Sequence, residues 1–249
     1  MLAFGCLYYL DVPKTGSSRI AEVLRTHLNA PYEGGVRHRP LSARYDPRRA
    51  RLLSVRHPVQ FYRSLFAYGC GGRGRVHARL QEAGHADLYQ ADQAGFHRWL
   101  EWMLDPENGA VLGHGYGAGR IADLVGFASF QVIRMGLPGS DRLIGEMETR
   151  HDVTVRFDRP AHSPHAIIRC ERLEMDLLDA VRTLELPLRY GRPELKRELA
   201  KGIRRNASPL ASAFDISRLP ANLQGTVRER EWLMWQRFGY PPARADAAA

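Results

Sequence analysis

Apolar stretches of strand length alternate with helical periodicity along this chain. Residues 4–12, 51–56 and 165–170 are short and rich in apolar side chains, which predicts buried strands. Helices are expected over residues 17–28, 58–68, 88–104, 119–130, 138–150, 171–185, 192–204 and 221–238. Strands that alternate with helices predict an α/β fold of three layers, in which helices flank a mostly parallel central sheet.

Glycine, proline and polar residues mark the connections between these elements. Residues 30–50 are rich in Pro, Gly and Arg and are expected to form a loop, and Gly69 to Gly74 should form a flexible turn. No repeat and no linker divides the chain. We therefore expect a single domain over residues 1–240, followed by a disordered tail over residues 241–249.

The composition is that of a globular domain without a membrane anchor. A chain of 249 residues with 44% hydrophobic content can bury a sizeable core. No apolar run approaches the roughly 18 residues of a membrane span, and no signal peptide precedes the first strand, so we predict a cytoplasmic protein. Cys6, Cys70 and Cys170 are too scattered for a disulfide framework or a zinc site, and Cys6 and Cys170 are expected in the core.

The formal net charge of +9 favours anionic partners. Nearly all of the basic residues are arginines, and the lysines are Lys14, Lys196 and Lys201. The arginines are spread along the whole chain instead of being clustered among aromatic residues. This distribution argues against a nucleic-acid partner.

The first candidate site follows the first strand. Residues 13–18 read Pro-Lys-Thr-Gly-Ser-Ser and lead directly into a helix. A turn of small residues at a helix N-terminus presents backbone N–H groups to an anion, and the helix dipole adds partial positive charge. Lys14 adds a full charge, Gly16 allows a close approach of the backbone, and hydroxyl donors come from Thr15, Ser17 and Ser18.

The second candidate site follows the second strand. Arg56 ends this strand, where its guanidinium can bind a phosphate through two hydrogen bonds. Pro58 suits the first turn of the next helix, on which Phe61, Ser64 and Tyr68 share one face. Two anion sites on neighbouring strands predict a ligand that carries two separated phosphates.

The first segment differs from the phosphate loop of nucleotide hydrolases. That loop reads Gly-x-x-x-x-Gly-Lys-Ser/Thr, whereas Lys14 precedes the glycine here and the first glycine is missing. We also identify no acidic residue at the end of an apolar strand that is suited to magnesium. Both features argue against an ATP or GTP hydrolase.

The two segments together resemble the sulfotransferases that use 3′-phosphoadenosine 5′-phosphosulfate. The resemblance is in Pro-Lys-Thr-Gly-Ser-Ser at 13–18 and Val-Arg-His-Pro at 55–58, with a serine eight residues after the arginine. It extends to residues 168–176, 206–208 and 238–240 but is thin between 70 and 160. It implies a P-loop-like fold, transfer of a sulfuryl group to a hydroxyl or amine, and no metal cofactor.

The resemblance also implies roles for particular residues. In that family the first segment binds the 5′-phosphosulfate, and the second binds the 3′-phosphate of the cofactor, whose product is adenosine 3′,5′-bisphosphate. The first set is Lys14, Thr15, Gly16, Ser17 and Ser18, and the second is Arg56 and Ser64. A basic loop near the C-terminus covers the cofactor in related enzymes, which makes Arg204 and Arg205 further candidates. Many relatives have Asp where this chain has His57, and Arg where it has Phe61. The role of that arginine in the family is therefore not carried over to this chain.

Sulfuryl transfer needs a group that removes a proton from the acceptor. We select His38, on the loop between the two segments, as the catalytic base, because carbohydrate-acting relatives have a histidine base there. Lys14 is the second catalytic candidate, as the partner of the bridging oxygen. His57 is expected to be structural, and the other loop candidates are His114, His162 and His165. A Glu or Asp side chain is the alternative base.

The acceptor is expected to be a carbohydrate or another small molecule, bound by residues 70–160. Arg73, Arg75, Arg79 and Trp99 are candidates for contacts with an acidic sugar, although a solvated basic face explains the arginines equally well. Two alternative functions remain open. One is a small-molecule or nucleoside kinase with a degenerate phosphate loop, and the other is a basic nucleic-acid-binding protein without catalysis.

Overall fold

The computed structural model describes residues 1–202 and 209–240, which fall into two compact units. The first unit takes its residues from 1–56, 131–141 and 155–206, and the second from 57–130, 142–154 and 207–249. Because each unit interleaves distant segments, this division does not test the expectation of one domain. The tail expected over residues 241–249 lies outside the described residues.

The first unit is built on a mixed β-sheet. Among the described residues its strands have the order β3-β1-β2-β4-β5. Their bounds are β1 Leu2–Phe4, β2 Leu7–Leu10, β3 Tyr32–Gly34, β4 Ala50–Val55 and β5 Ala166–Arg169. β2, β4 and β5 are parallel, whereas β1 pairs antiparallel with both β2 and β3. The predicted α/β class is confirmed, but the parallel part of the sheet is confined to three strands.

The N-terminal apolar stretch forms two strands, so the single strand expected over residues 4–12 is wrong. A tight turn at Gly5 and Cys6 joins β1 to β2 and leaves Cys6 half-buried. Apolar patterning cannot mark this break, because the residues on both sides of the turn are apolar, and the glycine is the local signal. The loop expected over residues 30–50 likewise contains β3, which pairs with β1.

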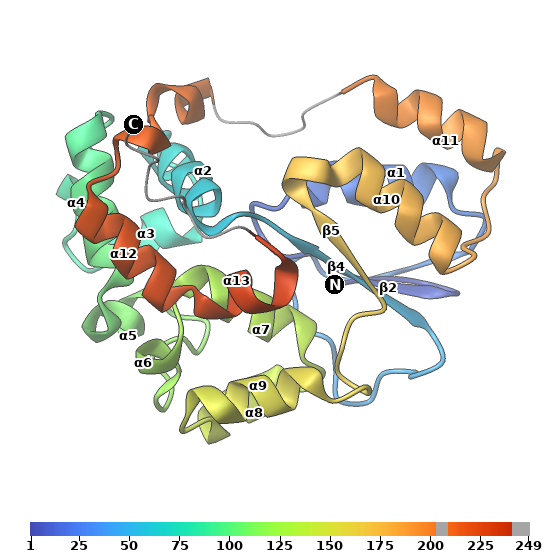
Figure 1. The fold of residues 1–249 in the computed structure, drawn as a ribbon, viewed down its shortest axis with the longest axis horizontal. Helices are drawn as coiled ribbons and strands as arrows, with labels where there is room; N and C mark the ends of the chain where they lie inside the picture. Colours follow the sequence, from blue (N-terminus) through green and yellow to red (C-terminus); the bar gives the residue numbers. More distant parts are fainter. Residues whose placement is uncertain (203–208, 241–249) are drawn as a thin grey trace, which may run out of the picture. The chain divides into compact units, whose positions relative to one another are not determined.

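Three helices cover one face of the sheet (Figure 1). They are α1 Ser17–His27, α10 Leu173–Thr183 and α11 Gly191–Ala200. Tyr9 and Leu52 of the sheet pack with Leu24 and Leu177 of these helices in one apolar core. The opposite face is also buried, since Leu53 approaches Gly136 in α7 Phe127–Gly136. Burial on both faces explains why the parallel strands are almost entirely apolar.

The second unit is helical throughout its described part. Its longer helices are α2 Pro58–Cys70, α3 Arg75–Glu82, α4 Gln93–Leu104, α12 Ala221–Arg230 and α13 Trp232–Phe238. The shorter ones are α5 Gly109–Leu112, α6 Ile121–Leu124, η1 Ala86–Leu88, η2 Pro106–Asn108, η3 Ile144–Glu146, η5 Pro209–Ala213 and η6 Ile216–Arg218. Three helices, α7, α8 Ser140–Leu143 and α9 Arg150–Asp158, contribute residues to both units.

Several predicted helices are present with different limits. The single helix expected over residues 138–150 is wrong, since the short helices α8 and η3 replace it and α9 begins only at Arg150. The last helix, expected over 221–238, is broken at Glu231 into α12 and α13, and it ends as expected at Gly239, whose φ is 63°. α2 passes through Gly69, so the glycine turn begins later than predicted, and α3 was not expected at all.

A buried carboxylate organises part of the second unit. Glu231 is 0% exposed and accepts hydrogen bonds from the hydroxyls of Tyr62 and Ser129. It also accepts the backbone N–H groups of Ala128 and Ser129, in the first turn of α7. A carboxylate at a helix N-terminus satisfies donors that the helix itself cannot pair. Burial raises the pKa of Glu231, and these hydrogen bonds oppose that effect.

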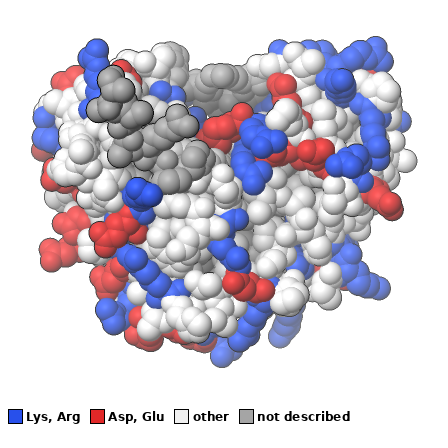
Figure 2. All heavy atoms as spheres, viewed as in Figure 1, with Lys and Arg blue, Asp and Glu red and all other residues white. Residues whose placement is uncertain are grey.

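No helix within residues 1–202 and 209–240 is long and apolar enough to cross a membrane. Lys and Arg side chains are interspersed with Asp and Glu on the face seen in Figure 2. On that face the excess of positive charge is therefore distributed, as the sequence suggests, and does not form one basic patch.

Candidate functional site

The turn over residues 13–18 connects the carboxyl end of β2 to the N-terminus of α1. Lys14 has a φ of 64° and Gly16 a φ of 77°, both in the left-handed region. Glycine is required at position 16 for a second reason, because a Cβ there would lie 2.8 Å from Cδ1 of Leu173. Gly16 is the N-cap of α1 and Ser17 is the first residue of the helix. The backbone is thus bent sharply below the N-terminus of the helix.

Arg56 lies at the equivalent end of the neighbouring strand. β2 and β4 are parallel and in register, with Leu10 opposite Leu53, so both strands end at the same edge of the sheet. Nη1 of Arg56 donates a hydrogen bond to the main-chain oxygen of Lys14 at 3.0 Å. This bond supports the left-handed conformation of Lys14, which costs on the order of 1–3 kcal/mol in a residue with a side chain. The structure therefore brings the two predicted segments together at Lys14 and Arg56.

A chain of buried hydroxyls lies beneath the turn. Oγ1 of Thr15 is 2.7 Å from the main-chain oxygen of Val12 and 2.6 Å from Oγ of Ser54. The carbonyl can only accept, so Thr15 donates to it and accepts from Ser54, which in turn accepts from the Tyr9 hydroxyl at 3.0 Å. The hydroxyl proton of Thr15, a residue that is 1% exposed, is therefore used inside the protein. Its side chain fixes the turn, and its main chain remains the part suited to a ligand.

A cluster around Asp11 forms the other side of the site. The cluster consists of Asp11, Ser17, Arg37 and His38. The carboxylate of Asp11 is buried, and it accepts hydrogen bonds from Nε of Arg37 and from the backbone N–H of His38, the latter at 3.1 Å. Arg37 also donates from Nη2 to Oγ of Ser17 at 2.9 Å. Residues 37 and 38 of the loop are thus fixed to the end of β2 and to the first residue of α1.

The ring of His38 has a defined orientation. Its Nδ1 lies 2.6 Å from the main-chain oxygen of Asp11, which can only accept, so Nδ1 carries a proton and Nε2 of the neutral ring has the lone pair. Burial lowers the pKa of His38; the hydrogen bond and the negative charge of Asp11 oppose this, while Arg37 and the amino group of Met1 reinforce it. A neutral imidazole with an available Nε2 is the form that a general base requires.

Asp11 was missed by the sequence interpretation, although it does follow an apolar strand. Its oxygens are engaged by Arg37, His38 and the amino group of Met1, which lies 3.1 Å away. No local pattern connects Asp11 to a loop 26 residues later. The available signal was an acidic residue between a buried strand and a proline.

Three of the other predicted phosphate ligands, Ser64, Arg204 and Arg205, stay predictions, whereas Ser18 lies at the start of α1. Ser64 lies half-buried on α2 in the second unit, so its place beside Arg56 stays a prediction. Arg204 and Arg205 lie outside the described residues. Ser18 is the second residue of α1 and half-buried.

The other histidine candidates have contacts within the protein. The ring of His57 packs against Trp235 at 5.2 Å, as expected for a structural residue. Nδ1 of His162 lies 2.8 Å from the main-chain oxygen of Arg156, and Nδ1 of His165 accepts the backbone N–H of Arg51 at 2.9 Å. His114 lies in a turn with a φ of 58°.

The residues of the second unit that were predicted to contact the acceptor differ in their exposure. Trp99 is 0% exposed and packs among aromatic rings that include Phe66 and Tyr62, so its predicted contact with a sugar is wrong. Its burial follows from the apolar face of α4. Arg73 stacks on Tyr68, with 4.7 Å between its guanidinium carbon and the ring centre. Its neighbour Arg75 begins α3 and is exposed.

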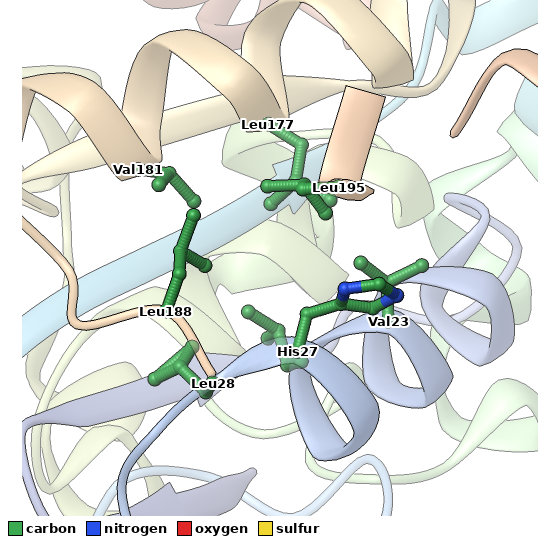
Figure 3. A pocket seen from close by; sticks show the side chains of 8 residues that line it. Val23, His27, Leu28, Leu177, Val181, Leu188 and Leu195 are labelled. Atoms are coloured by element: carbon green, nitrogen blue, oxygen red, sulfur yellow. The ribbon is translucent and has the colours of Figure 1, made fainter. Parts of the chain in front are cut away.

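A small cavity lies between the helices α1, α10 and α11 of the first unit (Figure 3). Its lining is apolar except for His27 and comes from α1, α10, α11 and the segment before α11. It includes Val23, Leu177, Leu188 and Leu195. The space open to the centre of a water molecule is about 10 Å³, which is room for roughly one water. Neither Lys14 nor Arg56 lines this cavity, which is too small for a nucleotide.

Comparison with known proteins gives no family for this chain. No protein-family model matches it, and no curated protein or solved structure matches it either.

Proposed function

We propose that this protein is a sulfotransferase that uses 3′-phosphoadenosine 5′-phosphosulfate. The observation that carries the proposal is the hydrogen bond from Arg56 to the main chain of Lys14, across the ends of two parallel strands. It means that a cationic residue of the second segment lies next to the turn of the first. Such a pair of neighbouring sites suits a nucleotide with phosphates at both its 3′ and 5′ positions.

The chemistry proposed for Lys14 is charge stabilisation. In sulfuryl transfer the bond between sulfur and the bridging oxygen breaks while a bond from the acceptor oxygen to sulfur forms. Lys14 would stabilise the negative charge that develops on the departing phosphate, together with N–H groups at the start of α1. The N–H groups are held by the helix before the reaction begins, so they need little reorganisation when the charge appears.

His38 is proposed to take the proton of the acceptor. Its Nδ1–H is held by the main-chain oxygen of Asp11, so the proton is received at Nε2. The imidazolium formed in this way lies near the Asp11 carboxylate, since 3.5 Å separates Nδ1 from Oδ2. Negative charge at this distance favours the protonated ring.

The remaining predictions about ligands, acceptor, location and fold belong to the same proposal. Ser64, Arg204 and Arg205 are kept as ligands of the nucleotide, and the acceptor is kept as a carbohydrate or another small molecule. A cytoplasmic location, the P-loop-like character of the fold and the absence of a metal requirement also remain proposed.

A thermal-shift comparison tests the proposal against a kinase. We expect adenosine 3′,5′-bisphosphate to raise the melting temperature without a metal, because ligands that bind only the folded state stabilise it. ATP with magnesium should have a much smaller effect. Stabilisation by ATP with magnesium alone would instead support a kinase, and stabilisation by neither ligand would exclude both nucleotide sites.

A further inference from the structure

The proposed function does not explain why Asp11 is buried as a carboxylate with a cationic partner. The residue is 0% exposed and directly follows β2. A buried carboxylate is costly unless it is paired, and pairs of this kind are not required for stability. Asp11 is paired with Arg37, which comes from a loop whose remaining side chains are largely exposed, such as Val36 and Arg39. What the pairing achieves is a fixed position for the Arg37 guanidinium.

That position is beside the first turn of α1. Nη2 of Arg37 donates to Oγ of Ser17 at 2.9 Å, and Nε is held by Asp11. Two contacts on different nitrogens fix the plane of the guanidinium. About a third of the side chain, 32%, is still exposed, so part of the group remains accessible to a ligand. The N–H of Ser17 opens the helix and has no acceptor within it.

We propose that Arg37 is a further binding residue for the 5′-phosphosulfate end of the nucleotide, and that Asp11 positions it. This inference rests on the proposed function. A guanidinium binds two oxygens of a phosphate or sulfonate at once, and orientation in advance reduces the entropy lost on binding. The charge of Asp11 is balanced by Arg37 and by the amino group of Met1, so the carboxylate does not oppose the binding of an anion nearby.

A second consequence concerns the geometry of catalysis. Arg37 and His38 are adjacent in the chain and are anchored to the same residue, through the side chain and the main chain of Asp11. A sulfonate bound by Arg37 would therefore lie close to the base that receives the proton of the acceptor. Asp11 is a positioning residue in this arrangement, since it acts through its two neighbours.

Calorimetric titration with adenosine 3′,5′-bisphosphate tests the inference. We expect Arg37→Gln to weaken binding about tenfold or more, as for the loss of a charge-assisted hydrogen bond. Displacement titrations then measure the affinity of the variant for each monophosphate. We expect the same loss of affinity for adenosine 5′-phosphate and less than a twofold change for adenosine 3′-phosphate. Asp11→Asn, in which Arg37 loses the charged partner that orients it, should give a smaller loss with the same preference for the 5′ end.

The matched control is Arg39→Gln, which removes the same charge from the same loop. The side chain of Arg39 is exposed, so Arg39→Gln should leave all three affinities within twofold of those of the unaltered protein. If Arg37→Gln does not fold, Arg37→Lys keeps the charge without the planar fork and should still lose 5′-phosphate affinity. Unchanged binding in the Arg37 variants, or an equal loss at both ends, would overturn the inference while leaving the proposed function intact. Absence of binding by the unaltered protein would instead refute the proposed function.

Discussion

At the residue scale, the site contains side chains whose protons are oriented by main-chain oxygens, which can only accept hydrogen bonds. The main-chain oxygen of Asp11 determines the tautomer of His38, and that of Val12 determines the direction of the hydroxyl chain through Thr15 and Ser54. The proposed base and the turn are thereby oriented before any ligand binds. This kind of preorganisation is what charge stabilisation in an active site requires.

The protonation of His38 can be measured without a known acceptor. Because burial lowers its pKa, we expect the ring to titrate below 6.5 in an NMR titration, with the Nδ1–H tautomer at neutral pH. Asp11→Asn removes a negative charge near the ring and should lower the midpoint further. A base works in its deprotonated form, so the acid limb of the rate profile should shift to lower pH in that variant. A midpoint at or above 6.5, or an Nε2–H tautomer, would contradict the assignment.

The hydroxyl chain predicts a stability effect at Ser54. Ser54→Ala removes the acceptor of the Tyr9 hydroxyl and the donor to Thr15 in a fully buried site. We expect the free energy of unfolding to fall by about 1–3 kcal/mol, the usual cost of unsatisfied buried polar groups. Denaturant titration measures this loss. Ser42→Ala, at an exposed position, should stay within about 0.5 kcal/mol of the original protein.

At the element scale, the close packing of α1 against α10 explains the glycine in the turn. Gly16→Ala would force a left-handed residue and place a Cβ against Leu173, the first residue of α10. We expect a loss of at least about 1 kcal/mol in the free energy of unfolding, because a positive φ is unfavourable for alanine. Binding of adenosine 3′,5′-bisphosphate should weaken in the same variant, since the helix N-terminus moves.

Gly225→Ala is the matched comparison in the second unit. Gly225 lies inside α12, with open space around its Cβ position, so alanine should stabilise the helix by up to about 1 kcal/mol. Destabilisation at both glycines would show that the argument from φ and contact at Gly16 is not specific.

The elements differ in how well the sequence predicts them. α1 and β4 are marked by continuous local patterns, and both are found close to their expected limits. The hairpin between β1 and β2 has Gly5 as its one local signal, and the apolar pattern runs through it unbroken; the pairing of β1 with β3 has no local signal in the sequence. The Lys14 turn was recognisable as a candidate anion site because its residues are contiguous, whereas Asp11 and Arg37 are far apart in the sequence. Their pairing exists only after the sheet has formed.

At the scale of the whole molecule, the central claim is that two neighbouring strand ends bind the two phosphates of one nucleotide. Lys14 and Arg56 are the two cations of that claim, and both belong to the first unit. Arg44 offers a comparison in the same unit, because its side chain is exposed and it belongs to neither segment.

The most direct test is calorimetric titration of the full chain with adenosine 3′,5′-bisphosphate, repeated on Lys14→Ala, Arg56→Ala and Arg44→Ala. Loss of a charge-assisted contact should weaken binding about tenfold or more in the first two variants and leave the third within twofold. Melting temperatures recorded alongside would show whether each variant is folded. The account predicts measurable one-to-one binding that depends on both Lys14 and Arg56; no binding by the unaltered chain, or equal binding by all of the folded variants, would contradict it.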